Sequence, residues 1–207
     1  MENYFHEIEE KARECYEIAR RARKKGYDPK KEVEISFAKD LADRVEELVG
    51  PKGIAQKIRK YLKEKGREET ALQIAVEIAE GMEGDFAGII EQAVRTGLAI
   101  LTEGVLVAPI EGISSVEIGK NADGSRYVDL YFAGPIRSAG GTGEAMSVLI
   151  ADLVRRKLGI ERYKPTEDEI ERYKEEIPLY DRITHLQYLP SPEEIEIIIR
   201  NCPVCIN

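Results

Sequence analysis

A strand, a glycine-rich loop and a helix follow one another between Tyr127 and Gly159, and this segment constrains the fold most. Aromatic and β-branched residues at 127–132 predict a short strand, and four glycines lie within residues 133–143. The apolar side chains that follow share one face at helical spacing: Met146, Leu149, Ile150, Leu153 and Val154. The polar face is expected to carry cations near the negative end of the helix dipole: Arg155, Arg156 and Lys157. The segment therefore predicts a strand and a helix joined by a glycine-rich loop.

Within the glycine-rich loop, only Arg137 and Ser138 have side chains with obvious phosphate chemistry. Glycines permit the close approach of a ligand, and N–H groups at the start of a helix suit an anion. The loop lacks both the Gly-Lys-Ser/Thr of a P-loop and the third glycine of a dinucleotide fingerprint. A tight turn whose glycines serve packing is favoured over a phosphate-binding loop, which stays open as the alternative.

The net charge of −8 argues against a chain that simply wraps nucleic acid, but the charge is unevenly distributed. Residues 1–66 hold 17 Lys and Arg against 14 Asp and Glu, whereas residues 67–207 hold 14 against 25. Contact with nucleic acid is therefore expected mainly in the first third. No apolar run is long enough to cross a membrane and the N-terminus is acidic, so a cytoplasmic protein without membrane contact is expected.

The first third begins with a predicted helix over residues 4–25, which ends in a cationic cluster before Gly26. Its small and apolar side chains are spaced 3, 4, 3, 4, 3, which is the seam of a helix that pairs with one other helix. The seam residues are Phe5, Ile8, Ala12, Cys15, Ala19 and Ala22.

A strand at 33–37, helices at 38–49 and 54–65, and the turn Gly50-Pro51-Lys52-Gly53 come next. Strand, helix, GxxG and helix are the minimal order of a KH module, in which such a loop clamps a nucleic-acid backbone. The predicted contacts are the two glycines and nearby cations: Gly50, Lys52, Gly53, Lys57 and Lys60. Glycine at a helix end followed by proline is also an ordinary stop between two helices, so both interpretations stay open.

Two further helices are predicted, a buried one over 70–80 and one that Asp85 caps, before the pattern changes at Thr102. Short apolar runs then alternate with glycines, and residues 121–124 predict a hairpin turn into the strand at 127–132. The sequence thus predicts an α+β protein with a mainly helical domain over 1–101. A smaller mixed domain over 102–207, centred on the loop at 133–143, is expected to continue beyond Asn207.

Two features mark the last forty residues. Thr166 and Glu169 form a capping-box signature for a helix that is expected to end near Pro178, with irregular chain over 180–189. Cys202 and Cys205 have the spacing of half a tetrahedral zinc site, but no second half is evident. Coincidence, or half of a site cut off from this chain, is favoured over a complete metal site.

No catalytic set can be assembled from the sequence. The chain has two histidines, neither in a recognisable nucleophile context, and its carboxylates lie mostly on helix faces beside Lys and Arg. Neither a cofactor site nor a complete metal site is predicted, and the chain alone is expected to be inactive.

Several motifs closely resemble the N-terminal region of the large subunit of archaeal family-D DNA polymerase, also called DNA polymerase II. The most specific is Gly-Pro-Ile-Arg-Ser-Ala-Gly-Gly-Thr at 134–142, and the resemblance covers nearly the whole chain. Similar runs lie at 48–51, 154–159, 162–166, 189–192 and 200–204. Gly143-Glu144 departs from the family's usual Ala-Gln.

The resemblance implies a role as the accessory N-terminal segment of a two-subunit replicative polymerase, which synthesises DNA and carries 3′-5′ exonuclease activity. The implied partners are the small exonuclease subunit, the remainder of the large subunit and DNA. The family's catalytic aspartates lie in a later motif, so the divalent metal, expected to be Mg²⁺, belongs to the whole polymerase. The alternative from the residues themselves is a protein–protein interaction or self-association domain without nucleic-acid contact.

Overall fold

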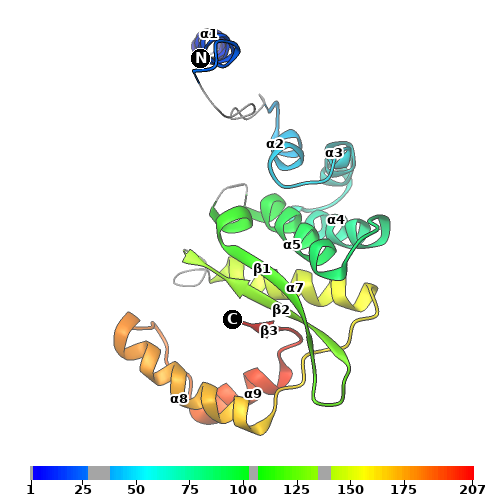
Figure 1. The fold of residues 1–207 in the computed structure, drawn as a ribbon, viewed down its shortest axis with the longest axis vertical. Coiled ribbons are helices and arrows are strands. Elements are labelled where there is room, and N and C mark those ends of the chain that lie inside the picture. Colours follow the sequence, from blue (N-terminus) through cyan, green and yellow to red (C-terminus); the bar gives the residue numbers. More distant parts are fainter. Residues whose placement is uncertain (1, 28–37, 103–106, 135–140) are drawn as a thin grey trace. The chain divides into compact units, whose positions relative to one another are not determined.

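The computed structural model describes residues 2–27, 38–102, 107–134 and 141–207 (Figure 1). Helices and one small sheet make up this part of the chain, which confirms the α+β class. The chain divides into two compact units, Met1–Phe37 and Ala38–Asn207. Within the second unit, the helix α5 (Phe86–Thr102) packs against α7 (Thr142–Lys157). The domain boundary expected after residue 101 stays a prediction.

The first unit contains the helix α1 (Glu2–Lys24), as the sequence predicts. Alanine, glutamate, arginine and lysine dominate it, and all four favour helices. Gly26 ends the helix with a φ of 76°, and the N–H of Tyr27 donates to the carbonyl of Ala22 at 3.1 Å. These bonds satisfy carbonyls that the last turn leaves free.

Among the described residues of the second unit, four α-helices precede the sheet, and α4 and α5 form the largest contact among them. Asp40 and Asp85 start α2 and α5, since their carboxylates accept from the N–H groups of Asp43 and Gly88 at 2.9 and 2.7 Å. The cap that the sequence predicts at Asp85 is therefore confirmed. Among the helices of the described ranges, none is both long and apolar enough to cross a membrane. The four are α2 (Leu41–Leu48), α3 (Ile54–Glu64), α4 (Arg67–Gly81) and α5 (Phe86–Thr102).

A π-helical turn, η1 (Val107–Glu111), leads into the three-stranded sheet. The strands β1 (Ile113–Lys120) and β2 (Arg126–Phe132) are antiparallel and form the predicted hairpin. The strand β3 (Cys205–Ile206), which the sequence analysis did not predict, pairs with β2 in parallel and completes the order β1-β2-β3. The core residues Val128 and Leu130 are fully buried in the same cluster as side chains of α5 and α7, with Asp129 between them pointing to the opposite face.

Asn121 ties the hairpin turn to a segment forty residues later. Its backbone carbonyl accepts from the N–H of Gly124 at 2.9 Å, which closes the turn. Its side-chain amide donates to the carbonyl of Arg162 at 2.9 Å, and its Oδ1 accepts from the N–H of Lys164 at 2.8 Å. Asn121 is 6% exposed, so these bonds are made away from water.

The buried face of α7 differs from the predicted stripe. Ile150 and Val154 are fully buried, but Leu149 is 42% exposed, and Ser147, Ala151 and Asp152 are buried instead. The helix packs against both α4 and α5, so small side chains allow a close approach on a wider face than one apolar stripe. Figure 1 shows α7 running beside α5 and the sheet.

Contrary to the prediction from the sequence, Arg155 does not lie on an exposed polar face together with Arg156 and Lys157. This side chain is 7% exposed and pairs with Asp152 at 2.5 Å. Its Nη1 also donates to the carbonyl of Ile160 at 3.2 Å, just beyond the helix. Arg155 therefore anchors the chain that leaves α7, whereas Arg156 and Lys157 remain on the exposed side.

The helix α8 (Glu167–Thr184) starts with the predicted capping box of Thr166 and Glu169 but does not end near Pro178. Proline removes one backbone hydrogen bond, yet its fixed φ is compatible with a helix, so α8 continues for six residues. A second capping box, Ser191 with Glu194, opens α9 (Pro192–Asn201). The expectation of irregular chain from residue 180 is therefore wrong as far as Thr184.

We expect Asn121→Ala to lower the free energy of unfolding by about 2–4 kcal/mol, measured by urea denaturation. The variant leaves the carbonyl of Arg162 and the N–H of Lys164 without their partner, and each buried unsatisfied group costs about 1–3 kcal/mol. Lys164→Met is the control, because it removes the exposed ion pair with Asp123 but keeps the backbone bond to Asn121. Equal losses for the two variants would contradict the role assigned to the Asn121 side chain.

Candidate nucleic-acid interface

The turn between α2 and α3 uses both of its glycines for structural reasons. A Cβ on Gly50 would lie 2.8 Å from Cγ2 of Ile54 and 3.1 Å from the carbonyl oxygen of Val45. Gly53 precedes α3 with a φ of 87°, in the left-handed region that favours glycine. The GxxG pattern is thus explained by the geometry of a tight connection between two helices, whether or not the turn binds a ligand.

The start of α3 already holds an anion from the protein itself. A carboxylate oxygen of Glu46, on α2, accepts from the N–H of Ala55 at 2.7 Å. A carboxylate is favoured at the positive end of a helix dipole, so Glu46 occupies part of the place where a phosphate would otherwise bind. Any contact with nucleic acid at this turn therefore depends on lysine side chains more than on the helix terminus.

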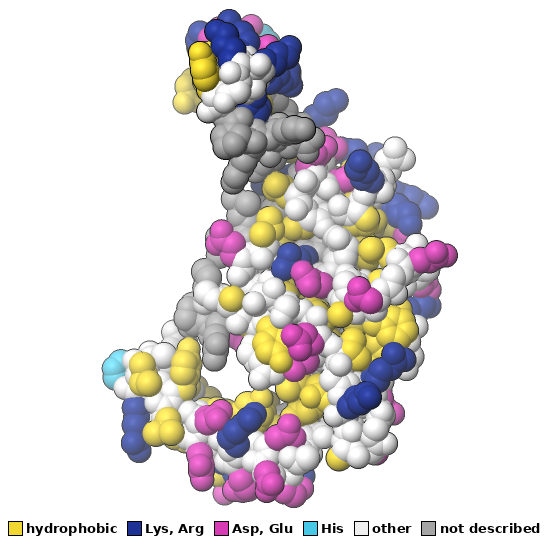
Figure 2. Space-filling model, viewed as in Figure 1, with side chains coloured by type: hydrophobic (Ala, Val, Ile, Leu, Met, Phe, Trp, Pro, Cys, Tyr) yellow, Lys and Arg dark blue, Asp and Glu magenta, His cyan; other side chains and the backbone are white. Residues whose placement is uncertain are grey.

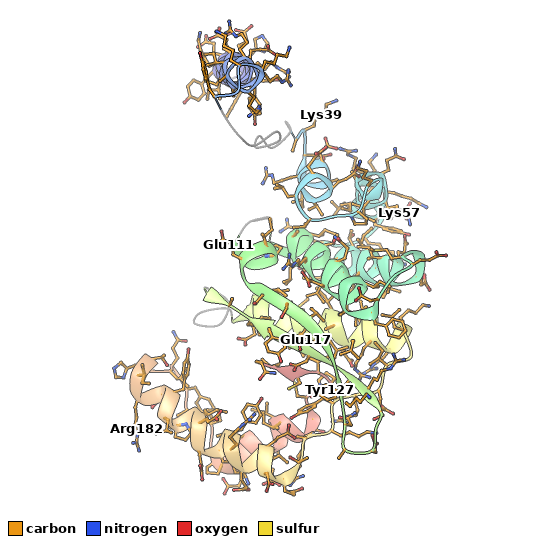
Figure 3. All side chains as sticks on the ribbon, in the orientation of Figure 1. Lys39, Lys57, Glu111, Glu117, Tyr127 and Arg182 are labelled. Carbon is orange, nitrogen blue, oxygen red and sulfur yellow. The ribbon has the colours of Figure 1, made fainter. Side chains whose placement is uncertain are left out.

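Two cations of α3 are engaged in holding helices together. Lys57 pairs with Glu77 of α4 at 2.7 Å, on the side of α3 that faces α4 (Figure 3). Arg59 donates to both carboxylate oxygens of Asp40, at 2.7 and 3.0 Å, and also pairs with Asp43. Hydrogen bonds to the carboxylates of Asp40 and Asp43 stabilise the charged guanidinium and raise the pKa of Arg59 above its usual value. The predicted contact Lys57 is therefore primarily a link between α3 and α4.

Lys52 and Lys60 are in a different environment. Both are exposed, and Lys63 follows on the same side of α3 at helical spacing from Lys60. Within residues 38–102, none of the three ammonium groups has a carboxylate partner, although Lys60 lies 5.9 Å from the centre of the Tyr61 ring. We call Lys52, Lys60 and Lys63 the α3 lysine row. Flexible ammonium groups of this kind suit the phosphates of a nucleic-acid backbone.

The remaining predicted contacts cannot be placed beside the α3 lysine row. Arg137 and Ser138 lie outside the described residues, as does the expected strand at 33–37, so the KH-like unit stays a prediction. On either side of the gap, Gly134 and Gly141 have φ values of 50° and 45°. Both therefore use conformations that favour glycine, which a tight turn and a ligand loop would share.

Cys202 and Cys205 lie at the end of α9 and in β3. Burial raises the pKa of the Cys205 thiol to about 12, and the nearby carboxylate of Asp129 adds to this effect. The thiol is thus protonated at neutral pH in the metal-free protein, and a metal would have to displace this proton. Among the residues that the structure describes, no three His, Cys, Asp or Glu side chains are placed to hold an ion. These residues do not fit a complete zinc or Mg²⁺ site, and the half-site stays a prediction.

The sequence analysis did not identify the acidic residues that engage α3 and its cations. Glu46, Asp40 and Glu77 were not singled out, because their partners lie 9 to 20 residues away on other helices. Only Asp40 had a local signal, since an aspartate directly before an apolar-periodic segment is a common helix cap.

Almost the entire chain is similar in sequence to proteins of one family. A sequence model of the family described as DNA polymerase II large subunit DP2, N-terminal, matches residues 3–207. The DNA polymerase II large subunits of Methanosarcina barkeri and Thermoplasma acidophilum are each 55% identical to this chain over 100% of the chain's length. The large subunit of Pyrococcus abyssi is 55% identical over 99% of the chain.

The chain covers a small part of these relatives, namely 18%, 19% and 14% of their respective lengths. The family model nevertheless spans nearly all of the chain, and the identities are far above 30%. The chain therefore belongs to the family of N-terminal regions of DNA polymerase II large subunits.

Proposed function

We propose that this chain is an accessory module of a replicative DNA polymerase, which supports assembly of the large subunit and contacts the DNA backbone. The observation that carries the DNA contact is the α3 lysine row, Lys52, Lys60 and Lys63, beside the turn at Gly50–Gly53. Phosphate contacts by lysines supply affinity and position without reading sequence. The module would therefore hold DNA of any sequence near the rest of the enzyme.

The chemistry of the whole polymerase belongs, in this proposal, to residues outside this chain. DNA synthesis and its Mg²⁺ would be located in the remainder of the large subunit, and 3′-5′ exonuclease activity in a small subunit. The family membership supports the placement of the chain within a large subunit.

Replacing Lys52 and Lys60 by glutamine should weaken the binding of primer–template DNA by the complete two-subunit polymerase. Each lost phosphate contact is expected to reduce the slope of log affinity against log salt concentration by about 0.9, so the double variant should lose about two units. Fluorescence anisotropy across a series of KCl concentrations measures this slope.

Lys120→Gln is the matched control, because Lys120 is also exposed but lies at the end of β1. It removes the same type of charge at a distance from the turn and should leave the slope unchanged. An unchanged slope in the double variant, or an equal loss per charge in Lys120→Gln, would contradict a phosphate contact at the α3 lysine row.

A second candidate function, self-association, is favoured by one observation on α1. Its apolar residues Tyr4, Phe5, Ile8 and Ile18 are 48–64% exposed. Residues 2–17 contain six glutamates against two cations, whereas residues 18–25 contain five cations and no acidic residue. An antiparallel pair of two α1 helices would place each acidic half against a basic half.

If α1 forms such a pair, the chain should sediment as a reversible dimer whose population rises with concentration. Ile8→Ser removes an apolar side chain from the seam of both copies and should raise the dissociation constant about tenfold or more. Asn3→Ser, on the opposite face of the same helix, is the control and should leave the constant unchanged. A monomer at all concentrations would exclude this candidate.

A further inference from the structure

The second half of α8 has an apolar face that nothing in the described part of the chain covers. Ile183 is 79% exposed and Leu179 is 53% exposed; Tyr180 is exposed too, as is Leu186, two residues beyond the helix. Figure 2 shows hydrophobic side chains gathered on the part of α8 at the lower left of the view, beside a hollow in the surface. A helix in a globular protein normally turns its polar face to water, so a run of large apolar side chains marks a surface of interaction.

This face forms one wall of a groove against the edge of the sheet. The groove has a volume of about 400 Å³. Its other wall contains Phe132 of β2 with Ile206 and Asn207 at the end of β3. A second hollow, of about 640 Å³, shares these three residues and continues past Ala133 and Gly134. We call the two together the α8 groove.

The main chain of β3 leads directly into the α8 groove. The N–H of Asn207 donates to the carbonyl of Leu130 at 2.9 Å, and its carbonyl accepts from the N–H of Phe132 at 2.8 Å. Because β3 is parallel to β2, a chain continuing from Asn207 would run past Phe132 and along the groove. The outward carbonyl of Ile206 accepts from the Tyr173 hydroxyl at 3.1 Å, so α8 already contacts the outer edge of β3.

The charged side chains that line the α8 groove indicate the chemistry of a segment that would bind in it. Glu144 of α7 lines it without a cationic partner among the described residues, and burial raises the pKa of its carboxyl group. Glu176 is 3.6 Å from Arg172, on the same helix. An occupant with several apolar side chains and a cation near Glu144 would bury the exposed face of α8 and neutralise this carboxylate.

We propose that the α8 groove is occupied by the segment that follows Asn207 within the same large-subunit polypeptide. The matched family region is described as N-terminal, and the relatives are more than five times as long as this chain. The first residues of that segment start at the groove and need no diffusion to find it, so their effective concentration there is high. The inference rests on the assembly part of the proposed function and is independent of DNA contact.

The test uses the full-length large subunit in complex with its small subunit. A photo-reactive p-benzoylphenylalanine is placed at Ile183, which lines the groove, or at the preceding residue, Arg182, which lies on the outer side of α8 (Figure 3). After irradiation, mass spectrometry identifies the cross-linked peptides. We expect the probe at position 183 to cross-link to residues beyond Asn207 of the same polypeptide, at least tenfold more than the probe at position 182.

Three results would overturn the proposal. Cross-links from position 183 to the small subunit or to a second large subunit would identify a different occupant. The absence of a cross-linked product would show that this face stays open, and equal products at positions 182 and 183 would show no preference for the groove. The DNA-contact proposal is tested separately, by the salt dependence of DNA binding in the Lys52 and Lys60 variant. Either proposal can therefore fail while the other holds.

Discussion

The close contact between α5 and α7 organises the second unit. A Cβ on Gly97 would lie 2.8 Å from Cδ1 of Ile150, so any larger residue would require this side chain to move, and glycine lets the two helices approach closely without it. One turn earlier in α5, Gln92 donates to the carbonyl of Val49, and Thr96 donates to the carbonyl of Gln92 at 2.7 Å. The same helix that packs on α7 therefore also fixes the end of α2, and with it the turn that begins at Gly50. The position of the α3 lysine row depends on packing about forty residues further along the chain.

The sequence predicted the helix starts and the hairpin turn that depend on contacts between residues close in sequence. Asp85, Thr166 and the turn at Asn121 mark the start of two helices and the hairpin, because caps and turns are made by residues close in sequence. The strand β3 escaped prediction, since its two residues pair with β2 about 75 residues earlier and have no periodicity of their own. The buried face of α7 was only partly predicted because it is decided by two helices and a sheet, not by one apolar stripe.

In the candidate site, too, the sequence predicted the cations but not their partners on other helices. The sequence indicated a basic segment around Lys52, Lys57 and Lys60, and the structure places all three on or beside α3. It could not indicate that Glu77 engages Lys57 or that Glu46 occupies the first turn of α3, since these contacts cross between helices. Counting cations therefore overestimates the free positive charge, and among the lysines at this turn and on α3 the contacts favoured by the described residues are Lys52, Lys60 and Lys63.

The pairing of β3 with β2 has a consequence for the order in which the second unit folds. The contacts of α4 with α5 and of β1 with β2 join neighbours in sequence, so they can form while later residues are still being synthesised. The third strand of the sheet requires a chain closure over about 75 residues, and Asn207 then hydrogen-bonds Asp129 across that closure at 2.7 Å. Until then β2 has an unpaired edge, which can pair with another chain. Completion of the sheet is thus a late step, during which the nascent subunit is most exposed to mispairing.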